Sequence, residues 1–229
     1  MRLDRFLSET TGMSRKDATR ILQKETVTVN GVQQKKSAFK VPSGAEVIWN
    51  ETRLELSGPT YLMMNKPLDC VCANDDGLHR TVFSYLDVPN PSKLHTVGRL
   101  DLDTSGLLLI TDDGKWSHRI TSPKYQCTKV YRAWLADPIT EDDAEAFATG
   151  LQLRGEETLT APAVLDIVNE YEALVHVHEG RYHQVRRMFA AIGNKVEQLH
   201  REQVGQLKLD ENLAPGEYRS LDKAEIALF

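Results

Sequence analysis

The sequence predicts an α+β fold in two parts: a small amino-terminal domain, and a larger domain built on a largely antiparallel mixed sheet. Its 229 residues suit one medium domain with a small one appended. Gly58 and Pro59 disfavour any regular element across that point. Beyond it, expected strands outnumber helices and often follow one another without the helix that a parallel crossover needs. We expect the domains at residues 1–57 and 61–229, with a linker at 58–60.

The first domain is expected to contain two short helices and a hairpin. Apolar residues recur at helical spacing up to Gly12, and a second helix begins at Ser14, a favourable N-cap. Alternating residues then lead into Asn30-Gly31, a strong hairpin signal, and residues 46–49 suggest a further strand. The helical residues expected to face inward are Leu3, Phe6, Leu7, Ala18, Ile21 and Leu22.

The larger domain is expected to mix strands with two helices. The first helix is capped by Thr140, with Asp143 three residues on, and ends at Gly150. The second covers residues 182–192 and places apolar side chains on one face. The expected strands cover residues 61–65, 107–111, 130–135, 163–168 and 173–178.

Composition excludes several classes of protein. The 41% hydrophobic and 27% charged residues are ordinary for a globular chain. No apolar run is long enough to span a membrane, and MRLDRFLSET lacks the apolar core of a signal peptide, so we expect a cytosolic protein. Three cysteines are an odd number for a disulfide framework, which indicates reduced packing residues.

The net charge of −5 hides a polarised chain. Residues 1–40 hold nine Lys or Arg against four acids, whereas residues 136–172 hold ten acids and one base. Because phosphate is bound by Lys and Arg, we expect RNA to contact one side only. The basic residues expected to bind it are Arg2, Arg15, Lys16 and Arg20, unless they simply solvate a surface helix.

The segments LDRFLSE, SRKDATRIL, VTVNG and PSGAEVIW resemble the small RNA-binding domain named after ribosomal protein S-four, over residues 1 to about 50. The resemblance implies that the two helices and the hairpin bind structured RNA through its shape and backbone.

Residues 95–114, HTVGRLDLDTSGLLLITDDG, place Arg99, Asp101 and Asp103 before an apolar strand. One aspartate could attack a sugar carbon, held ionised by a nearby arginine. The spacing also fits part of a calcium loop, although Leu109 and Asp112 stand where that loop has a polar residue and a glutamate. A third interpretation is a surface turn whose aspartates cap backbone amides.

GRLDLDTSGLLL resembles the signature of the pseudouridine synthases, in which the aspartate after Arg-Leu is essential. NKP, KVYRAWL, EGRYHQVRRMF and QLHREQVG are further matches in order, over residues 61–220. WSHRITSPK at 116–124 and the amino-terminal domain are similar to the branch that modifies small-subunit (16S) ribosomal RNA, the RsuA family. The alternatives are a sibling enzyme for large-subunit RNA and a non-catalytic RNA-binding or ribosome-assembly module.

The resemblance implies roles for five residues of the larger domain. Asp101 is the catalytic carboxylate, and Tyr131 stacks on the target base. Arg186 pairs with Asp101, with Arg187 as the alternative, and Arg99 holds the nucleotide by its phosphate. The reaction breaks and re-forms one glycosidic bond, so no cofactor or metal is expected. The expected partner is small-subunit RNA or an assembling particle, bound by a monomer.

Two clusters could in principle bind a metal. His176 and His178 lie two residues apart on one strand face, and Cys70 and Cys72 lie near a histidine. A third ligand is not evident for the histidines, so a solvated strand face is favoured. A half-buried strand explains the two cysteines.

Overall fold

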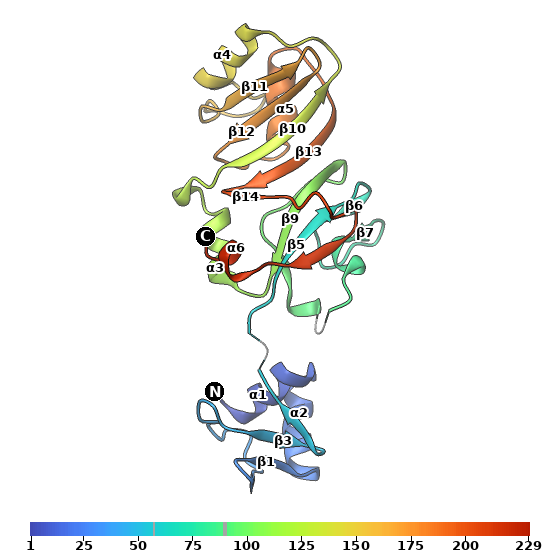
Figure 1. The fold of residues 1–229 in the computed structure, drawn as a ribbon, viewed down its shortest axis with the longest axis vertical. Helices are drawn as coiled ribbons and strands as arrows, with labels where there is room; N and C mark the ends of the chain where they lie inside the picture. The colour runs from blue at the N-terminus through green and yellow to red at the C-terminus, as the bar shows by residue number, and fades with distance from the viewer. Residues whose placement is uncertain (57, 89–90) are drawn as a thin grey trace. The chain divides into compact units, whose positions relative to one another are not determined.

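The computed structural model describes residues 1–56, 58–88 and 91–229, and it divides into two compact units, Met1–Pro59 and Thr60–Phe229 (Figure 1). Each unit has its own core. Ser57, at the end of the first expected domain, lies outside the described residues.

The smaller unit packs two helices against a four-stranded sheet of order β2-β1-β3-β4. Its elements are α1 (Leu3–Thr11), α2 (Arg15–Lys24), β1 (Val27–Val29), β2 (Val32–Gln33), β3 (Val47–Trp49) and β4 (Thr52–Leu54). The expected helices, hairpin and strand are confirmed. The signals that predicted them are local: Ser14 accepts a hydrogen bond from the Asp17 amide, and Asn30 and Gly31 both adopt the positive φ of a tight hairpin turn.

The larger unit is built on a nine-stranded sheet. Its main path runs β11-β12-β10-β13-β9-β5-β15, with β14 beside β13 and β8 beside β9. Within it, β13 pairs with β9 in parallel and the other pairings are antiparallel, which confirms the expected mixed sheet. The strands are β5 (Tyr61–Lys66), β8 (His95–Thr96), β9 (Thr104–Thr111), β10 (Lys129–Leu135), β11 (Val164–Asn169), β12 (Glu172–Val177), β13 (Val196–Val204), β14 (Leu207–Lys208) and β15 (Tyr218–Ser220).

Helices and short elements surround this sheet. The helix capped by Thr140 is confirmed, with its capping box. The other expected helix begins at Gln184, two residues late, because His183 adopts a left-handed φ of +48° that no α-helix continues. The helices are α3 (Gly114–Thr121), α4 (Glu141–Thr149), α5 (Gln184–Ala191) and α6 (Lys223–Ile226); β6 (Cys70–Val71) and β7 (Arg80–Thr81) form a separate small sheet.

Two halves of the larger unit have separate cores. In Figure 1, β10 to β13 with α4 and α5 form one half, and β5 and β9 with β6 and β7 form the other. The first core centres on Phe147, Val175 and Phe189, all fully buried. Strands β5 and β9 are buried on both faces, by one cluster around Met64 and another around Trp116. The halves are joined where β13 pairs with β9.

The remaining expectations concern cysteines and membrane spans. Cys70, Cys72 and Cys127 are free thiols, and the first two are buried, as expected of packing residues. Within the described parts of the chain, every helix is too short or too polar to cross a bilayer.

Candidate active site

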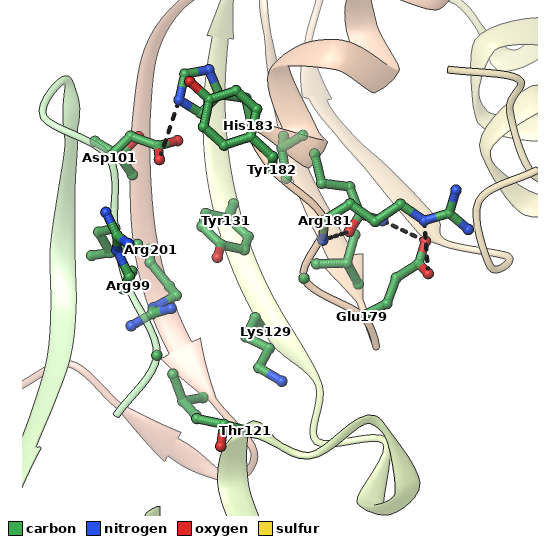
Figure 2. A pocket seen from close by; sticks show the side chains of 18 of the residues that line it. Arg99, Asp101, Thr121, Lys129, Tyr131, Glu179, Arg181, Tyr182, His183 and Arg201 are labelled. Atoms are coloured by element: carbon green, nitrogen blue, oxygen red, sulfur yellow. Dashed lines mark hydrogen bonds and ion pairs between the residues drawn. The ribbon is translucent and has the colours of Figure 1, made fainter. Parts of the chain in front are cut away.

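A cavity of about 470 Å³ lies in the larger unit at the junction of its two halves. Its walls come from residues 97–101 before β9, from β10, from residues 177–186 before and within α5, and from β13. Figure 2 shows Tyr131 in the middle of the view, with Asp101 and Arg201 to one side of it and Arg181 to the other. Asp101, Tyr131, Arg99 and Arg186 therefore line one cavity.

The backbone at Asp101 is held by a buried lysine. Lys66, at the end of β5, is fully buried, and its Nζ donates to the carbonyl oxygens of Asp101 at 3.0 Å and Thr104 at 2.9 Å. A third bond goes to the Pro67 carbonyl at 3.0 Å. Burial lowers the pKa of Lys66, and the three carbonyls replace part of its lost hydration. The turn that carries Asp101 is thereby attached to the central sheet.

The Asp101 carboxylate faces a histidine. Its side chain is 33% exposed, and its Oδ1 lies 3.4 Å from Nε2 of His183 (Figure 2). His183 stacks on the exposed ring of Tyr182, with 3.8 Å between ring centroids. The carboxylate thus opens onto solvent and the cavity, with an imidazole and an aromatic ring beside it.

The structure contradicts the expected pairing of Arg186 with Asp101. Arg186 Nη2 lies 3.0 Å from Oδ2 of Asp103 and also donates to the Asp103 carbonyl, while Nη1 donates to the Val196 carbonyl. Arg187, the alternative, pairs with Glu156. Neighbouring residues of a helix point about 100° apart, so the two arginines diverge, and in this structure neither contacts the Asp101 carboxylate.

Tyr131 and Arg201 lie opposite each other on neighbouring strands. They are partners in the β10–β13 register, and the Arg201 guanidinium carbon is 6.0 Å from the centre of the tyrosine ring. Arg201 is only 4% exposed, its Nε donates to the Leu107 carbonyl at 2.8 Å, and its buried Nη2 has no hydrogen-bond partner. A buried cation with a free donor therefore lies beside the tyrosine expected to stack on the base.

Backbone contact beneath Arg201 requires a glycine. Gly106 has a φ of +105°, and a β-carbon there would lie 2.3 Å from the Arg201 carbonyl oxygen. The parallel pairing of β9 with β13 brings these backbones together. Only glycine permits both the φ and the close approach.

The cavity is rich in positive charge. Lys129 lies on its wall; burial lowers the pKa of this lysine, the Cys127 thiol partly opposes the shift, and the charge of Arg201 adds to it. Arg99 is exposed at the same cavity. Arg181 pairs with Glu179, at 3.2 Å, on the far wall. Such a cavity suits an anionic ligand more than a neutral one.

Sequence reasoning assigned no role to four residues of this site, although each lies in a motif that was recognised. Lys66 belongs to NKP, Lys129 to KVYRAWL, His183 to EGRYHQVRRMF and Arg201 to QLHREQVG. Their positions in these motifs indicated that the four residues lie near the site, but the spacing of the motifs does not show which polar side chains are buried.

The competing interpretations of this segment fit the structure less well. Residues from Thr104 to Thr111 form strand β9, so the aspartates at its two ends do not surround a common ion, as a calcium loop would. Asp101 lines a cavity, which a simple surface turn does not require.

The possible metal site at His176 is not supported either. His176 lies 2.9 Å from Asp166 on the adjacent strand, and within the described ranges no three His, Cys, Asp or Glu side chains gather as metal ligands.

In the smaller unit, two expected RNA contacts share an internal partner. Arg2 and Arg15 each place a guanidinium nitrogen 2.9 Å from the Asp4 carboxylate. The hydrogen bond from Arg2, then that from Arg15, lowers the pKa of Asp4 to about 2, against the opposing effect of burial. Arg20 pairs with Asp17, and Lys16 is exposed. The side chains of Arg2 and Arg15 are nonetheless about half exposed, at 49% and 56%.

Comparison with known proteins identifies related chains. A family model described as RNA pseudouridylate synthase matches residues 60–191. Ribosomal small subunit pseudouridine synthase A of Vibrio cholerae is 55% identical over 227 residues, covering 99% of this chain and 98% of the relative. The proteins of that name from Vibrio vulnificus and Escherichia coli are 57% and 50% identical over 228 residues, with 99% of this chain and 98% and 99% of theirs covered. A crystal structure of a pseudouridylate synthase matches all of both chains at 46% identity, with a TM-score of 0.73.

Proposed function

Since this chain belongs to the RNA pseudouridylate synthase family, we propose that it isomerises one uridine of small-subunit (16S) ribosomal RNA to pseudouridine, with Asp101 as the catalytic carboxylate. The relatives from Vibrio cholerae, Vibrio vulnificus and Escherichia coli, at 55%, 57% and 50% identity, bear the small-subunit name and match over 98–99% of their length. The observation that supports the chemistry is the position of Asp101 on the wall of a cavity that also holds Tyr131.

The reaction breaks the bond between the anomeric carbon and N1, turns the base and rejoins it through C5. Asp101 either attacks the anomeric carbon or removes a proton from the sugar, and both routes need an ionised carboxylate. The Asp101 side chain is 33% exposed, so water reaches its carboxylate. A uridine in folded RNA must first be flipped out, at a cost of a few kcal/mol that stacking on Tyr131 partly offsets.

Different residues around the cavity position the turn that carries Asp101 and the bound nucleotide. Lys66 holds the turn of Asp101 from inside the sheet. Arg186, through Asp103 and the Val196 carbonyl, attaches the outer side of the same turn to α5 and β13. Arg99, exposed at the cavity, has the charge and access to hold the phosphate of the extruded nucleotide.

We assign the smaller unit to RNA binding as a domain of the ribosomal protein S-four type, in which Arg2, Arg15, Lys16 and Arg20 contact phosphate. Asp4 orients two of these arginines at one point of α1, which reduces the side-chain entropy that binding would remove. The enzyme is proposed to act as a monomer, in the cytosol, on bare RNA or an assembling particle.

The test is tritium release from RNA labelled at C5 of uridine, with purified protein and no added cofactor. Small-subunit and large-subunit transcripts are compared, each with and without bound ribosomal proteins. Release from small-subunit RNA alone is expected. Release from large-subunit RNA would show a sibling specificity, and binding without release from any substrate would show a non-catalytic assembly module.

Asp101→Asn tests the assignment of the carboxylate. The amide has the same shape but cannot act as nucleophile or base, so tritium release is expected to disappear while RNA affinity stays within about twofold. Asp103→Asn is the matched control, because it changes a carboxylate two residues away and should retain most of the activity. Loss of RNA binding in Asp101→Asn would contradict the assignment.

A further inference from the structure

We infer that Arg201 is a substrate-binding residue whose guanidinium holds the uracil base as an anion, after its bond to the sugar is broken and before it is rejoined. The inference rests on the proposed function and extends it. It names the group that keeps the detached base in the site and stabilises the charge that develops on it.

The first support is an unpaired donor. Within the described parts of the chain, three residues that line the cavity each have a buried side-chain polar atom without a hydrogen-bond partner. These three are Thr104 Oγ1, Arg186 Nε and Arg201 Nη2. A buried polar group without a partner is costly, and more so on a cation, so its retention at a cavity wall indicates a partner that arrives with the substrate.

The second support is the absence of a neutralising charge at Arg201. Within the described residues it makes no ion pair, and its one hydrogen bond there goes to a neutral carbonyl, that of Leu107. Its charge contributes to the lowered pKa of Lys129, so a buried arginine and a partly buried lysine together raise the potential of the same cavity. An anion placed between them would relieve this repulsion.

The chemistry supplies such an anion. When the bond from the anomeric carbon to N1 breaks, its electron pair stays on N1, and the negative charge of the uracil spreads to both carbonyl oxygens. C5 then bonds to the anomeric carbon as the Asp101 carboxylate leaves that carbon or, on the other route, as Asp101 returns the proton to the sugar. The proton leaves C5 and N1 gains a proton, so the product is an isomer of the substrate. A guanidinium that is buried and held in place stabilises this charge with little reorganisation of its surroundings.

The position of Arg201 selects the base over a phosphate. Its register partner is Tyr131, the ring expected to stack on the base. The guanidinium carbon of Arg201 is 6.0 Å from the centre of that ring, so its nitrogens can reach the edge of a stacked uracil. The phosphate of the extruded nucleotide stays joined to the RNA chain and so remains at the surface. The exposed Arg99, at the same cavity, can contact it there. The Nε bond to Leu107 and the close backbone contact with Gly106 hold Arg201 in place.

Single-turnover rates and RNA affinities of full-length Arg201→Met and Arg201→Lys test the inference. Removing one preorganised donor to a developing anion typically slows a reaction by about 10²–10³. We expect that loss for Arg201→Met, a smaller one for Arg201→Lys, and RNA affinity within about threefold of the parent. Arg132→Met is the control, because Arg132 is on the same strand as Tyr131 but on the opposite face, where it pairs with Glu172 and Glu202.

Chemical rescue separates a substrate contact from a structural one. Arg201→Ala should regain activity when guanidinium chloride is added at millimolar concentration, and urea at the same concentration should have no effect. Arg201→Met that retains its rate within threefold, or Arg201→Ala that is unresponsive to guanidinium, would overturn the inference. Failure of the proposed function is distinct, because the unmodified protein would then release no tritium.

Discussion

Arg186 and Asp103 form an ion pair, with 3.0 Å between Nη2 and Oδ2, beside the carboxylate proposed to act in catalysis. The two partners contribute differently. Asp103 is 63% exposed, whereas Arg186 is 19% exposed and also binds two backbone carbonyls. The arginine therefore keeps most of its anchoring when the aspartate is removed.

Asp103→Ala is accordingly expected to lower the free energy of unfolding by less than about 1 kcal/mol, as for an exposed ion pair. Arg186→Ala should cost more, about 2 kcal/mol, because it leaves the Val196 and Asp103 carbonyls without their donor. Urea denaturation of both variants measures the difference. Equal losses would show that the ion pair, not the carbonyl bonds, holds the turn.

Lys66→Met is expected to destabilise the larger unit by about 2–4 kcal/mol. The methionine fills the space but removes one donor from each of the Pro67, Asp101 and Thr104 carbonyls, although the Asp101 carbonyl keeps its bond from the Thr104 amide. We expect this loss to outweigh the free energy gained because a charge is no longer buried. Lys208→Met, at an exposed position in the same unit, is the control. The turnover number should also fall in buffer where the variant is fully folded, since the Asp101 turn is released. An unchanged turnover number there would argue against a positioning role.

Gly106→Ala is expected to lose more than about 4 kcal/mol or fail to fold. The added β-carbon would overlap the Arg201 carbonyl oxygen, at 2.3 Å, in a φ region that alanine avoids. Gly114→Ala provides the contrast, because it is helical with open space around it and should stabilise by up to about 1 kcal/mol. Thermal unfolding compares them. A Gly106→Ala protein with the parent melting temperature would mean that β9 and β13 are not in contact.

Asp4 should make the smaller unit sensitive to acid. Its pKa falls from 3.8 to about 2 on folding, so its contribution to stability is complete above about pH 4 and is lost as the pH drops towards 2. Asp4→Asn should remove that contribution at neutral pH and speed hydrogen exchange in α1, with Glu51→Gln, at an exposed residue, as control. If Asp4→Asn exchanges as slowly as the parent protein, the pairs with Arg2 and Arg15 do not stabilise α1.

The elements that the sequence predicted correctly are those with local signals. Ser14, the Asn30-Gly31 turn and the Thr140 capping box act within a few residues of themselves, so their geometry can be inferred from adjacent letters. Strand β13 was missed because VEQLHREQV is rich in polar residues. One of its polar side chains, that of Arg201, lines the cavity, so a residue that serves the site interrupts the strand's apolar pattern.

The partners of the site residues could not be predicted in the same way. Asp101 and Tyr131 were predicted as site residues because the motifs that contain them resemble those of the family. Whether Arg186 reaches Asp101 or Asp103 depends on side-chain directions set by α5, β9 and β13 together. The burial of Arg201 depends likewise on the pairing of strands far apart in the chain.

The bond from Arg201 to Leu107 joins residues 94 positions apart. Pairing two strands so far apart in the chain costs the conformational entropy of the long loop between them, and packing offsets that cost only once the strands have met. The pairing is therefore expected to form late and slowly. Helices and hairpins of both units can form without it, but the cavity cannot. During refolding, the return of enzymatic activity should therefore lag behind the return of helical circular dichroism, and it would mark the moment at which the central strands come together.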